Sequence, residues 1–178
     1  MSRRAQWAWA RAKPTTTSPR CWKSWKGLNT GDCPLIVLDA NLLLYAYDSA
    51  SAQHEPARRW VENTFSGVEP VGLPWQTISA FLRIATNVRL PGNRFTMEDA
   101  ANIVDQWAAL PMVRLLAPRD RHWAFFRRLL VEGQASGPLT TDAQLAAITI
   151  ENGGVLYTTD RDFARFPGLK WVNPLAAR

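Results

Sequence analysis

Cysteine and histidine are scarce in this chain, which has two residues of each among 178. Cys21 and Cys33 cannot form a disulfide framework, and neither a Cys-x-x-Cys pair nor the ligand spacing of a zinc site is present. No apolar run approaches the ~18 residues that cross a bilayer, and charges interrupt the first residues where a secretory signal needs an apolar stretch. We therefore expect a protein of a reducing compartment, the cytoplasm, with no membrane partner.

The net positive charge of +6 is confined to the beginning of the chain. Residues 1–34 hold seven Lys and Arg and one acid, Asp32, together with four of the nine tryptophans and a single branched aliphatic residue, Leu28. A segment with so few aliphatics has no apolar face to bury. We expect a basic, Trp-rich extension that is disordered or precedes the physiological start; the alternative is an arm that binds nucleic acid through phosphates and stacked bases. Residues 35–178 carry 14 basic and 14 acidic residues and suit one globular domain.

Strand and helix patterns alternate through the whole of this second part. Residues 35–38 are a continuous apolar run of the kind found in buried parallel strands, and Asp39 ends it. Thr141 is predicted to cap the last long helix. We expect strands at 35–38, 71–73, 112–116, 155–159 and 169–172, helices at 41–47, 53–66, 75–88, 96–110, 123–131 and 141–151, and a helical turn at 162–166. Such alternation predicts a doubly wound α/β fold with a mostly parallel sheet.

Aspartates stand where ligands bind in this class of fold. Asp39 and Asp160 end two predicted strands, and Asp142 lies in the first turn of the helix that precedes the second of them. Ligands of open α/β sheets bind beyond the carboxyl ends of the strands, so these aspartates and Asp162 are expected to meet there. Carboxylates brought together repel one another unless a cation neutralises them. Oxygen ligands without His or Cys favour Mg²⁺ or Mn²⁺, which activate water for phosphodiester hydrolysis.

Each aspartate also has a purely structural explanation. Asp39 alone fits a turn at a strand end, with Asn41 as the cap of the next helix. Asp142 alone fits the preference for acids near the positive end of a helix dipole, and Asp160 and Asp162 fit a solvated turn. Three acids that end two strands and open one helix are harder to explain in this way, so we favour the metal site.

Four segments of the chain are more informative together than singly. They read LIVLDAN at 35–41, AFLRIATN at 80–87, TTDAQLAA at 140–147 and LYTTDRDFARFPGL at 156–169. These segments resemble the PIN-domain ribonucleases, specifically the VapC-type toxins of toxin–antitoxin pairs, and the second is similar to the matching segment of a mycobacterial subgroup. The resemblance covers residues 35 to about 175, and it implies a PIN-like three-layer domain that starts near Leu35.

The resemblance implies an activity and partners as well. The protein would be an Mg²⁺-dependent endoribonuclease toxin, with Mn²⁺ as an alternative metal, that hydrolyses RNA to leave a 5′-phosphate and a 3′-hydroxyl. It would form a homodimer, and a cognate VapB-type antitoxin would neutralise it. The implied catalytic metal ligands are Asp39, Asp142 and Asp160, with Asp162 as an auxiliary ligand. Asn41 and Thr159 match the polar residues that orient the site through hydrogen bonds.

One position departs from the pattern of the family. Most members carry a Glu in the helix after the second strand, about where Phe81 stands, whereas no acid occurs here between Val71 and Met97. The acidic cluster is therefore one carboxylate short, or Glu98 from the next helix substitutes for it. The sequence leaves open whether such a site holds one metal ion or two.

Other classes of function remain open at this stage. A chain that keeps the fold but lacks the Glu would be a catalytically weakened RNA- or antitoxin-binding module, which metal-dependent turnover distinguishes from the enzyme. A phosphohydrolase with an aspartyl nucleophile fits less well, because the sequence after Asp39 reads Ala-Asn-Leu instead of Asp-x-Asp. A dinucleotide enzyme fits least, since no Gly-x-Gly-x-x-Gly motif follows a predicted strand.

Overall fold

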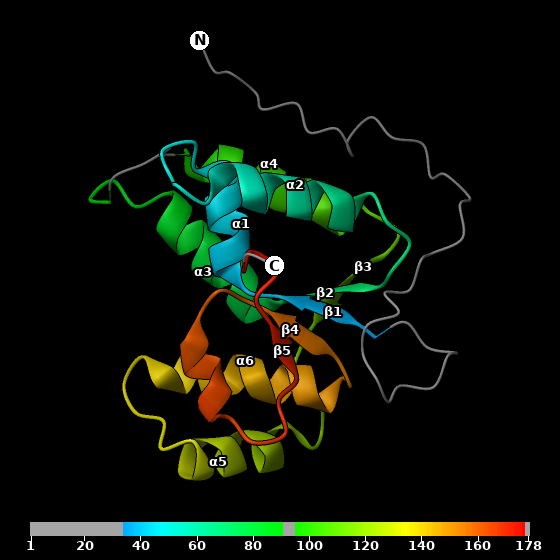
Figure 1. Cartoon of the computed structure of the whole chain (residues 1–178), viewed down its shortest axis with the longest axis vertical. Coiled ribbons are helices and arrows are strands. Elements are labelled where there is room, and N and C mark those ends of the chain that lie inside the picture. The colour runs from blue at the N-terminus through cyan, green and yellow to red at the C-terminus, as the bar shows by residue number, and fades with distance from the viewer. Residues whose placement is uncertain (1–33, 91–94, 177–178) are drawn as a thin grey trace.

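A five-stranded sheet forms the centre of the protein (Figure 1). The computed structural model describes residues 34–90 and 95–176, so the predictions for the extension before residue 34 lie outside the described residues. The strands follow the order β3-β2-β1-β4-β5, and all four neighbouring pairs are parallel. Their bounds are β1 (Ile36–Leu38), β2 (Val71–Pro74), β3 (Val113–Leu116), β4 (Val155–Tyr157) and β5 (Trp171–Val172). The predicted α/β fold with a parallel sheet is confirmed.

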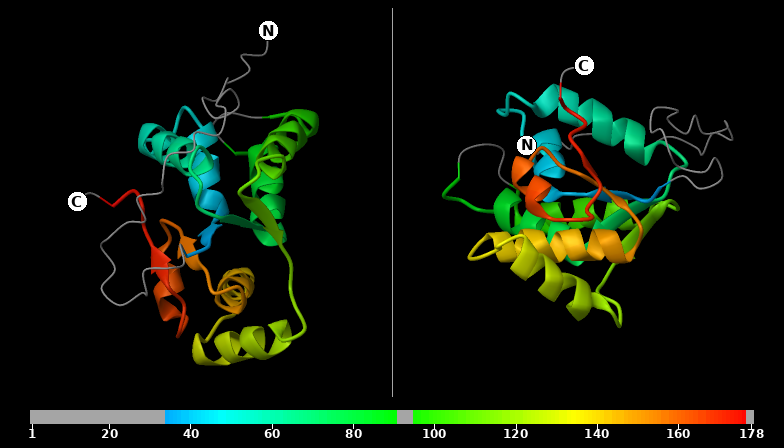
Figure 2. Two further views of the ribbon diagram at one scale, coloured as in Figure 1. Left: turned by 90° about the vertical axis from the view of Figure 1, so that its right-hand side faces the viewer. Right: turned by 60° about the horizontal axis from the view of Figure 1, so that its bottom comes forward.

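Helices cover both faces of the sheet and complete three layers, as Figure 2 shows. The first four lie on one face: α1 (Ala40–Tyr47), α2 (His54–Phe65), α3 (Trp75–Ala85) and α4 (Met97–Ala108). On the other face lie α5 (His122–Glu132), α6 (Leu139–Glu151) and the 3₁₀ helix η2 (Arg161–Arg165). Within the described residues, no helix is long and apolar enough to span a membrane.

The order of the strands reverses beside β1, and we call the region beyond the carboxyl ends of β1 and β4 the crevice. The chain passes from β1 to β2 and β3 in one direction, with α1 to α4 on one face as the connections. It then crosses by α5 and α6 on the other face and returns to β4, on the opposite side of β1. Beyond the carboxyl ends of strands, ligands bind where the strand order reverses in this way. The fold therefore predicts a functional site between the ends of β1 and β4.

Separate apolar cores join the layers. Between the sheet and α1 to α4, Trp107 packs its ring 4.7 Å from that of Phe81 and 5.8 Å from that of Tyr47, whose hydroxyl accepts the indole N–H. Between the sheet and α6, Phe163 of η2 and Phe166, which follows η2, join the core and are at most 2% exposed. These contacts hold α1, α6 and η2, which surround the crevice, against one rigid sheet.

Helix α6 begins earlier than the sequence pattern indicates. Thr141 was expected to cap it, but the helix starts at Leu139 and Pro138 occupies the position before it. The fixed φ of proline is already compatible with the start of a helix, which favours this earlier start. The prediction of Thr141 as a cap is therefore wrong, although Asp142 still lies in the first turn.

The far end of α6 is joined to the start of α5 by a buried polar pair. His122 Nδ1 lies 3.3 Å from Glu151 Oε2, and the same oxygen accepts the backbone N–H of Arg119. The two side chains are only 10% and 5% exposed. Since Glu151 lies nine positions after Asp142 in α6, at a rise of about 1.5 Å per residue, this pair stabilises the helix packing away from the crevice.

Candidate active site

The hydroxyl of Thr158 connects the carboxyl ends of β1 and β4. It donates to Asp39 Oδ2 at 2.7 Å and accepts from Asn41 Nδ2 at 2.9 Å. It also accepts the backbone N–H of Asp160 at 3.0 Å. Because Thr158 is fully buried, these bonds have no competition from water. One side chain therefore fixes Asp39, Asn41 and Asp160 around the same crevice.

The sequence pointed to Thr159 for this role, and the structure assigns it to the preceding residue. Strand β4 ends at Tyr157, two residues earlier than predicted, and Thr158 follows it directly. Successive residues of an extended chain point to opposite sides, so a shift of one residue exchanges a buried hydroxyl for a partly exposed one. A doublet of threonines contains no sequence signal that distinguishes the two.

Asp160 begins the short helix η2 and positions the next acid. Its Oδ1 accepts the backbone N–H of Asp162 at 2.8 Å, a side-chain cap of η2. Asp162 is exposed, and its carboxylate lies 3.5 Å from Arg165 Nη2. The cap keeps both acids and Arg165 on one short, rigid turn beside the crevice.

Asp142 enters the crevice from the first turn of α6, and its pKa shows how close the other acids are. Burial raises the pKa of Asp142 to about 6, and the charges of Asp39, Asp160 and Asp162 add to the increase, with Arg165 opposing it. The other three predicted site aspartates therefore lie close enough to Asp142 for their charges to act on it, as neighbouring carboxylates do when no cation lies between them.

Burial and neighbouring charge shift the pKa of Asp39 as well. Burial raises its pKa and the charge of Asp160 adds to this, whereas the Thr158 hydroxyl and the backbone N–H groups of Ala40 and Asn41 act in the opposite direction. Hydrogen bonds to a carboxylate favour its ionised form. The site is thus built to keep Asp39 oriented, while burial and neighbouring charge favour the uptake of a positive species.

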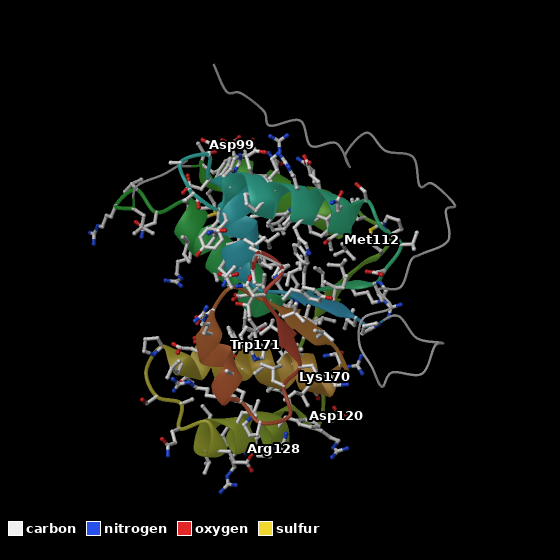
Figure 3. All side chains as sticks on the ribbon, viewed as in Figure 1. Asp99, Met112, Asp120, Arg128, Lys170 and Trp171 are labelled. Carbon is white, nitrogen blue, oxygen red and sulfur yellow. The ribbon has the colours of Figure 1, made fainter. Side chains whose placement is uncertain are left out.

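Neither position considered for a fourth carboxylate reaches the crevice. Phe81 is fully buried in the core around Trp107. Glu98 is exposed in the first turn of α4, next to Asp99, which lies at the top of Figure 3, whereas α6 lies in the lower half. The charges that act on Asp39 and Asp142 come from other residues. The structure therefore gives no support to Glu98 as a substitute for the missing acid.

The donor atoms of the crevice suit a divalent cation of the magnesium type. They are carboxylate and amide oxygens, which Mg²⁺ and Mn²⁺ prefer, and Asn41 Oδ1 is a buried acceptor without a hydrogen-bond partner among the described residues. As they stand, no three acidic, His or Cys side chains of residues 34–90 and 95–176 form a group that could hold a metal ion. The donor chemistry fits a cation whose binding would draw the carboxylates together.

Replacement of Asp142 by Asn should stabilise the metal-free protein at neutral pH. Below about pH 4 the Asp142 carboxyl is protonated in both the folded and the unfolded chain. As the pH rises from about 4 to about 6, the unfolded chain releases this proton while the folded chain retains it, so the free energy of unfolding falls. Above that pH, Asn removes a cost of about 1 kcal/mol, reduced by the partial exposure of the side chain. We expect the Tm of Asp142→Asn to exceed that of the wild type by about 3 °C at neutral pH in EDTA, measured by calorimetry, and to match it near pH 4.

Glu98→Gln is the matched control, since it removes an exposed acid from the first turn of α4, and Glu98 is not among the charges that act on Asp39 or Asp142. Its Tm should not rise at neutral pH, because only the favourable interaction with the helix dipole is lost. A Tm of Asp142→Asn that falls at neutral pH would contradict the repulsion inferred for the crevice.

Comparisons with known proteins agree with the fold. Residues 36–169 match the family model of the PIN domain. Ribonuclease VapC37 of Mycobacterium tuberculosis is 37% identical over 140 residues, which cover 79% of this chain and 97% of that protein. Ribonuclease VapC33 of the same species is 40% identical over 141 residues, with coverage of 79% and 99%.

A solved structure extends the likeness to three dimensions. VapBC2 from Rickettsia felis, bound to a DNA fragment from their promoter, contains a chain that matches with a TM-score of 0.58 at 15% identity, over 78% of this chain and 98% of that one. At this identity the match supports the fold alone, and the sequence relatives carry the rest. The chain therefore belongs to the PIN-domain family and is a relative of the VapC ribonucleases.

Proposed function

We propose that this protein is an Mg²⁺-dependent endoribonuclease toxin that a cognate VapB-type antitoxin neutralises. One observation carries the proposal. Thr158 forms hydrogen bonds with the Asp39 carboxylate and the backbone N–H of Asp160, so both acids lie beyond the ends of β1 and β4, where their charges also raise the pKa of Asp142. The relatives named ribonuclease VapC, at 37% and 40% identity, support RNA as the substrate. The fold shared with VapBC2 supports an antitoxin partner.

The residues that would hold the metal are Asp39, Asp142 and Asp160, with Asp162 as an auxiliary ligand. A bound Mg²⁺ supplies two functions in such a site, a water molecule activated as a nucleophile and an electrostatic partner for the phosphodiester. Thr158 orients Asp39 through its 2.7 Å hydrogen bond, so that this carboxylate need not reorganise during the reaction. Asn41 Oδ1, a buried acceptor without a partner among the described residues, could accept a hydrogen bond from a water molecule there.

We further propose that the protein acts as a homodimer and that hydrolysis leaves a 5′-phosphate and a 3′-hydroxyl. These ends result when water attacks the phosphorus atom and the bond to the 3′ oxygen breaks, so that the 3′ oxygen leaves as a hydroxyl and the 2′-hydroxyl takes no part. Contaminating ribonucleases that use the 2′-hydroxyl leave a 2′,3′-cyclic phosphate and need no metal. The chemistry of the ends therefore distinguishes the proposed activity from contamination.

The test is incubation of the purified full chain with total cellular RNA, in Mg²⁺, in EDTA, and in EDTA followed by excess Mg²⁺. We expect discrete fragments in Mg²⁺, at least about a hundredfold less cleavage in EDTA, and full recovery on re-addition, because the carboxylates alone supply no activated water. The new 5′ ends should be sensitive to an exonuclease that requires a 5′-phosphate. Cleavage that persists in EDTA, or no cleavage in any metal, would contradict the proposal.

A further inference from the structure

Arg165 is a cationic side chain that the fold brings to the acidic crevice, and the proposed function gives it no role. It is the last residue of η2, three positions after Asp162. Residues three apart share a face of a 3₁₀ helix, so Asp162 and Arg165 lie on one face of η2 and Phe163 on another, and Phe166 follows the helix. The two phenylalanines are buried against α6. Arg165 lies close enough to Asp142 for its charge to act on that carboxyl.

The contacts of Arg165 leave most of its binding capacity unused. Its Nε donates to the backbone oxygen of Asp162 at 3.2 Å, and its Nη2 lies 3.5 Å from Asp162 Oδ1. The two side chains are 36% and 57% exposed, and ion pairs as exposed as this contribute little stability. A guanidinium has five N–H donors in a planar fork, so within the described residues these contacts use a minority of them. A stronger anionic ligand can therefore displace the Asp162 carboxylate.

RNA binding at the crevice requires a cationic group. Its aspartates repel the phosphates of an incoming nucleic acid, and residues 35–178 have no excess of positive charge to offset this. Arg binds phosphate in a bidentate manner and remains charged at every relevant pH. An arginine fixed beside the carboxylates supplies attraction where the repulsion is greatest.

We propose that Arg165 binds an RNA backbone phosphate at the edge of the crevice and exchanges its contact with Asp162 for that phosphate when RNA arrives. This inference rests on the proposed function, because it assumes that RNA enters the crevice. Arg165 is a phosphate-binding residue in this scheme, and it is not a metal ligand.

The position of Arg165 gives its removal opposite effects on two ligands. RNA loses a cationic contact and should bind more weakly. Arg165 also repels a metal ion, because its positive charge acts at Asp142, one of the proposed ligands. Without Arg165, the metal ion should therefore bind more tightly. A merely structural role for Arg165 would weaken both, since a disordered η2 would misplace Asp160 and Asp162.

The experiment measures both affinities on the full chain without any turnover. Binding of a short fluorescein-labelled single-stranded RNA is followed by fluorescence anisotropy in EDTA at several KCl concentrations. Binding of Mn²⁺ without RNA is followed by the electron paramagnetic resonance signal of the free ion. For Arg165→Ala we expect RNA affinity to fall about tenfold or more, the slope of log affinity against log salt to decrease by about 0.7, and Mn²⁺ affinity to rise about threefold.

Two variants make the result specific. Arg161→Ala removes the same charge from an exposed position on η2 and should leave both affinities within about twofold of the wild type, because Arg161, unlike Arg165, is not among the charges that act on Asp39 or Asp142. Arg165→Lys keeps the charge without the planar fork, so Mn²⁺ affinity should match the wild type and RNA affinity should lie between those of the wild type and Arg165→Ala. Circular dichroism and Tm confirm that each variant folds.

Three outcomes overturn the inference. They are a wild type that binds no RNA, RNA affinity of Arg165→Ala equal to that of Arg161→Ala, and Mn²⁺ affinity of Arg165→Ala that stays constant or falls. Neither measurement requires cleavage. A wild type that fails to cleave RNA in Mg²⁺ therefore contradicts the proposed function separately, while the two affinities still report on Arg165.

Discussion

Replacement of Asp39 by Asn should reduce the rate of RNA cleavage by about 10³-fold or more, which corresponds to about 4 kcal/mol of transition-state stabilisation. The reason lies in the position of this side chain at the switch point between β1 and β4, where Thr158 holds it. Asn keeps the shape of Asp39 and one oxygen to accept from Thr158, so the fold should persist. It removes the negative charge that a cation requires. The measurement is the rate of cleavage in saturating Mg²⁺, with Tm as the check on folding.

Asp120→Asn serves as the matched control for this experiment. Asp120 is exposed and precedes α5, in the lower part of Figure 3. The substitution makes the same change of charge away from the crevice, so cleavage should remain within about twofold of the wild type. Cleavage by Asp39→Asn at a rate close to that of Asp120→Asn would show that the crevice between β1 and β4 is not where the reaction occurs.

Replacement of Phe81 by Glu should prevent folding instead of restoring the carboxylate that the family pattern contains. Phe81 is fully buried, with its ring 4.7 Å from that of Trp107 and 5.7 Å from that of Tyr47. Loss of a buried phenylalanine costs about 3–5 kcal/mol, and burial of a carboxylate costs several more. The sum is comparable to the whole stability of a typical domain, about 5–15 kcal/mol. We expect no cooperative thermal transition for Phe81→Glu, measured by circular dichroism.

Two substitutions separate packing from chemistry at this helix. Phe81→Leu keeps the site apolar and should cost about 1–2 kcal/mol while cleavage is retained. Ser79→Glu places a carboxylate on the exposed side of the same helix and should change stability by less than about 0.5 kcal/mol. If Phe81→Glu folded and cleaved RNA faster than the wild type, the side chain would have to reach the crevice, contrary to its place in the core.

The sequence alone was sufficient for the parallel α/β architecture and for the acids Asp39, Asp142 and Asp160 as candidates for one site. These features are local, since a buried parallel strand is a continuous apolar run and its carboxyl end follows directly. Once the strands are parallel, all their carboxyl ends lie at one edge, so acids that follow strands are expected to meet there.

Other features depended on contacts that no local pattern contains. Which threonine, Thr158 or Thr159, is buried against Asp39 depends on where β4 ends and on the alternation of side chains along it. The isolation of Glu98 and the approach of Arg165 depend on where α4 and η2 pack against the sheet. Patterns along the chain specify which elements form and which side chains are available, whereas distances between residues far apart in sequence arise only when the two cores pack.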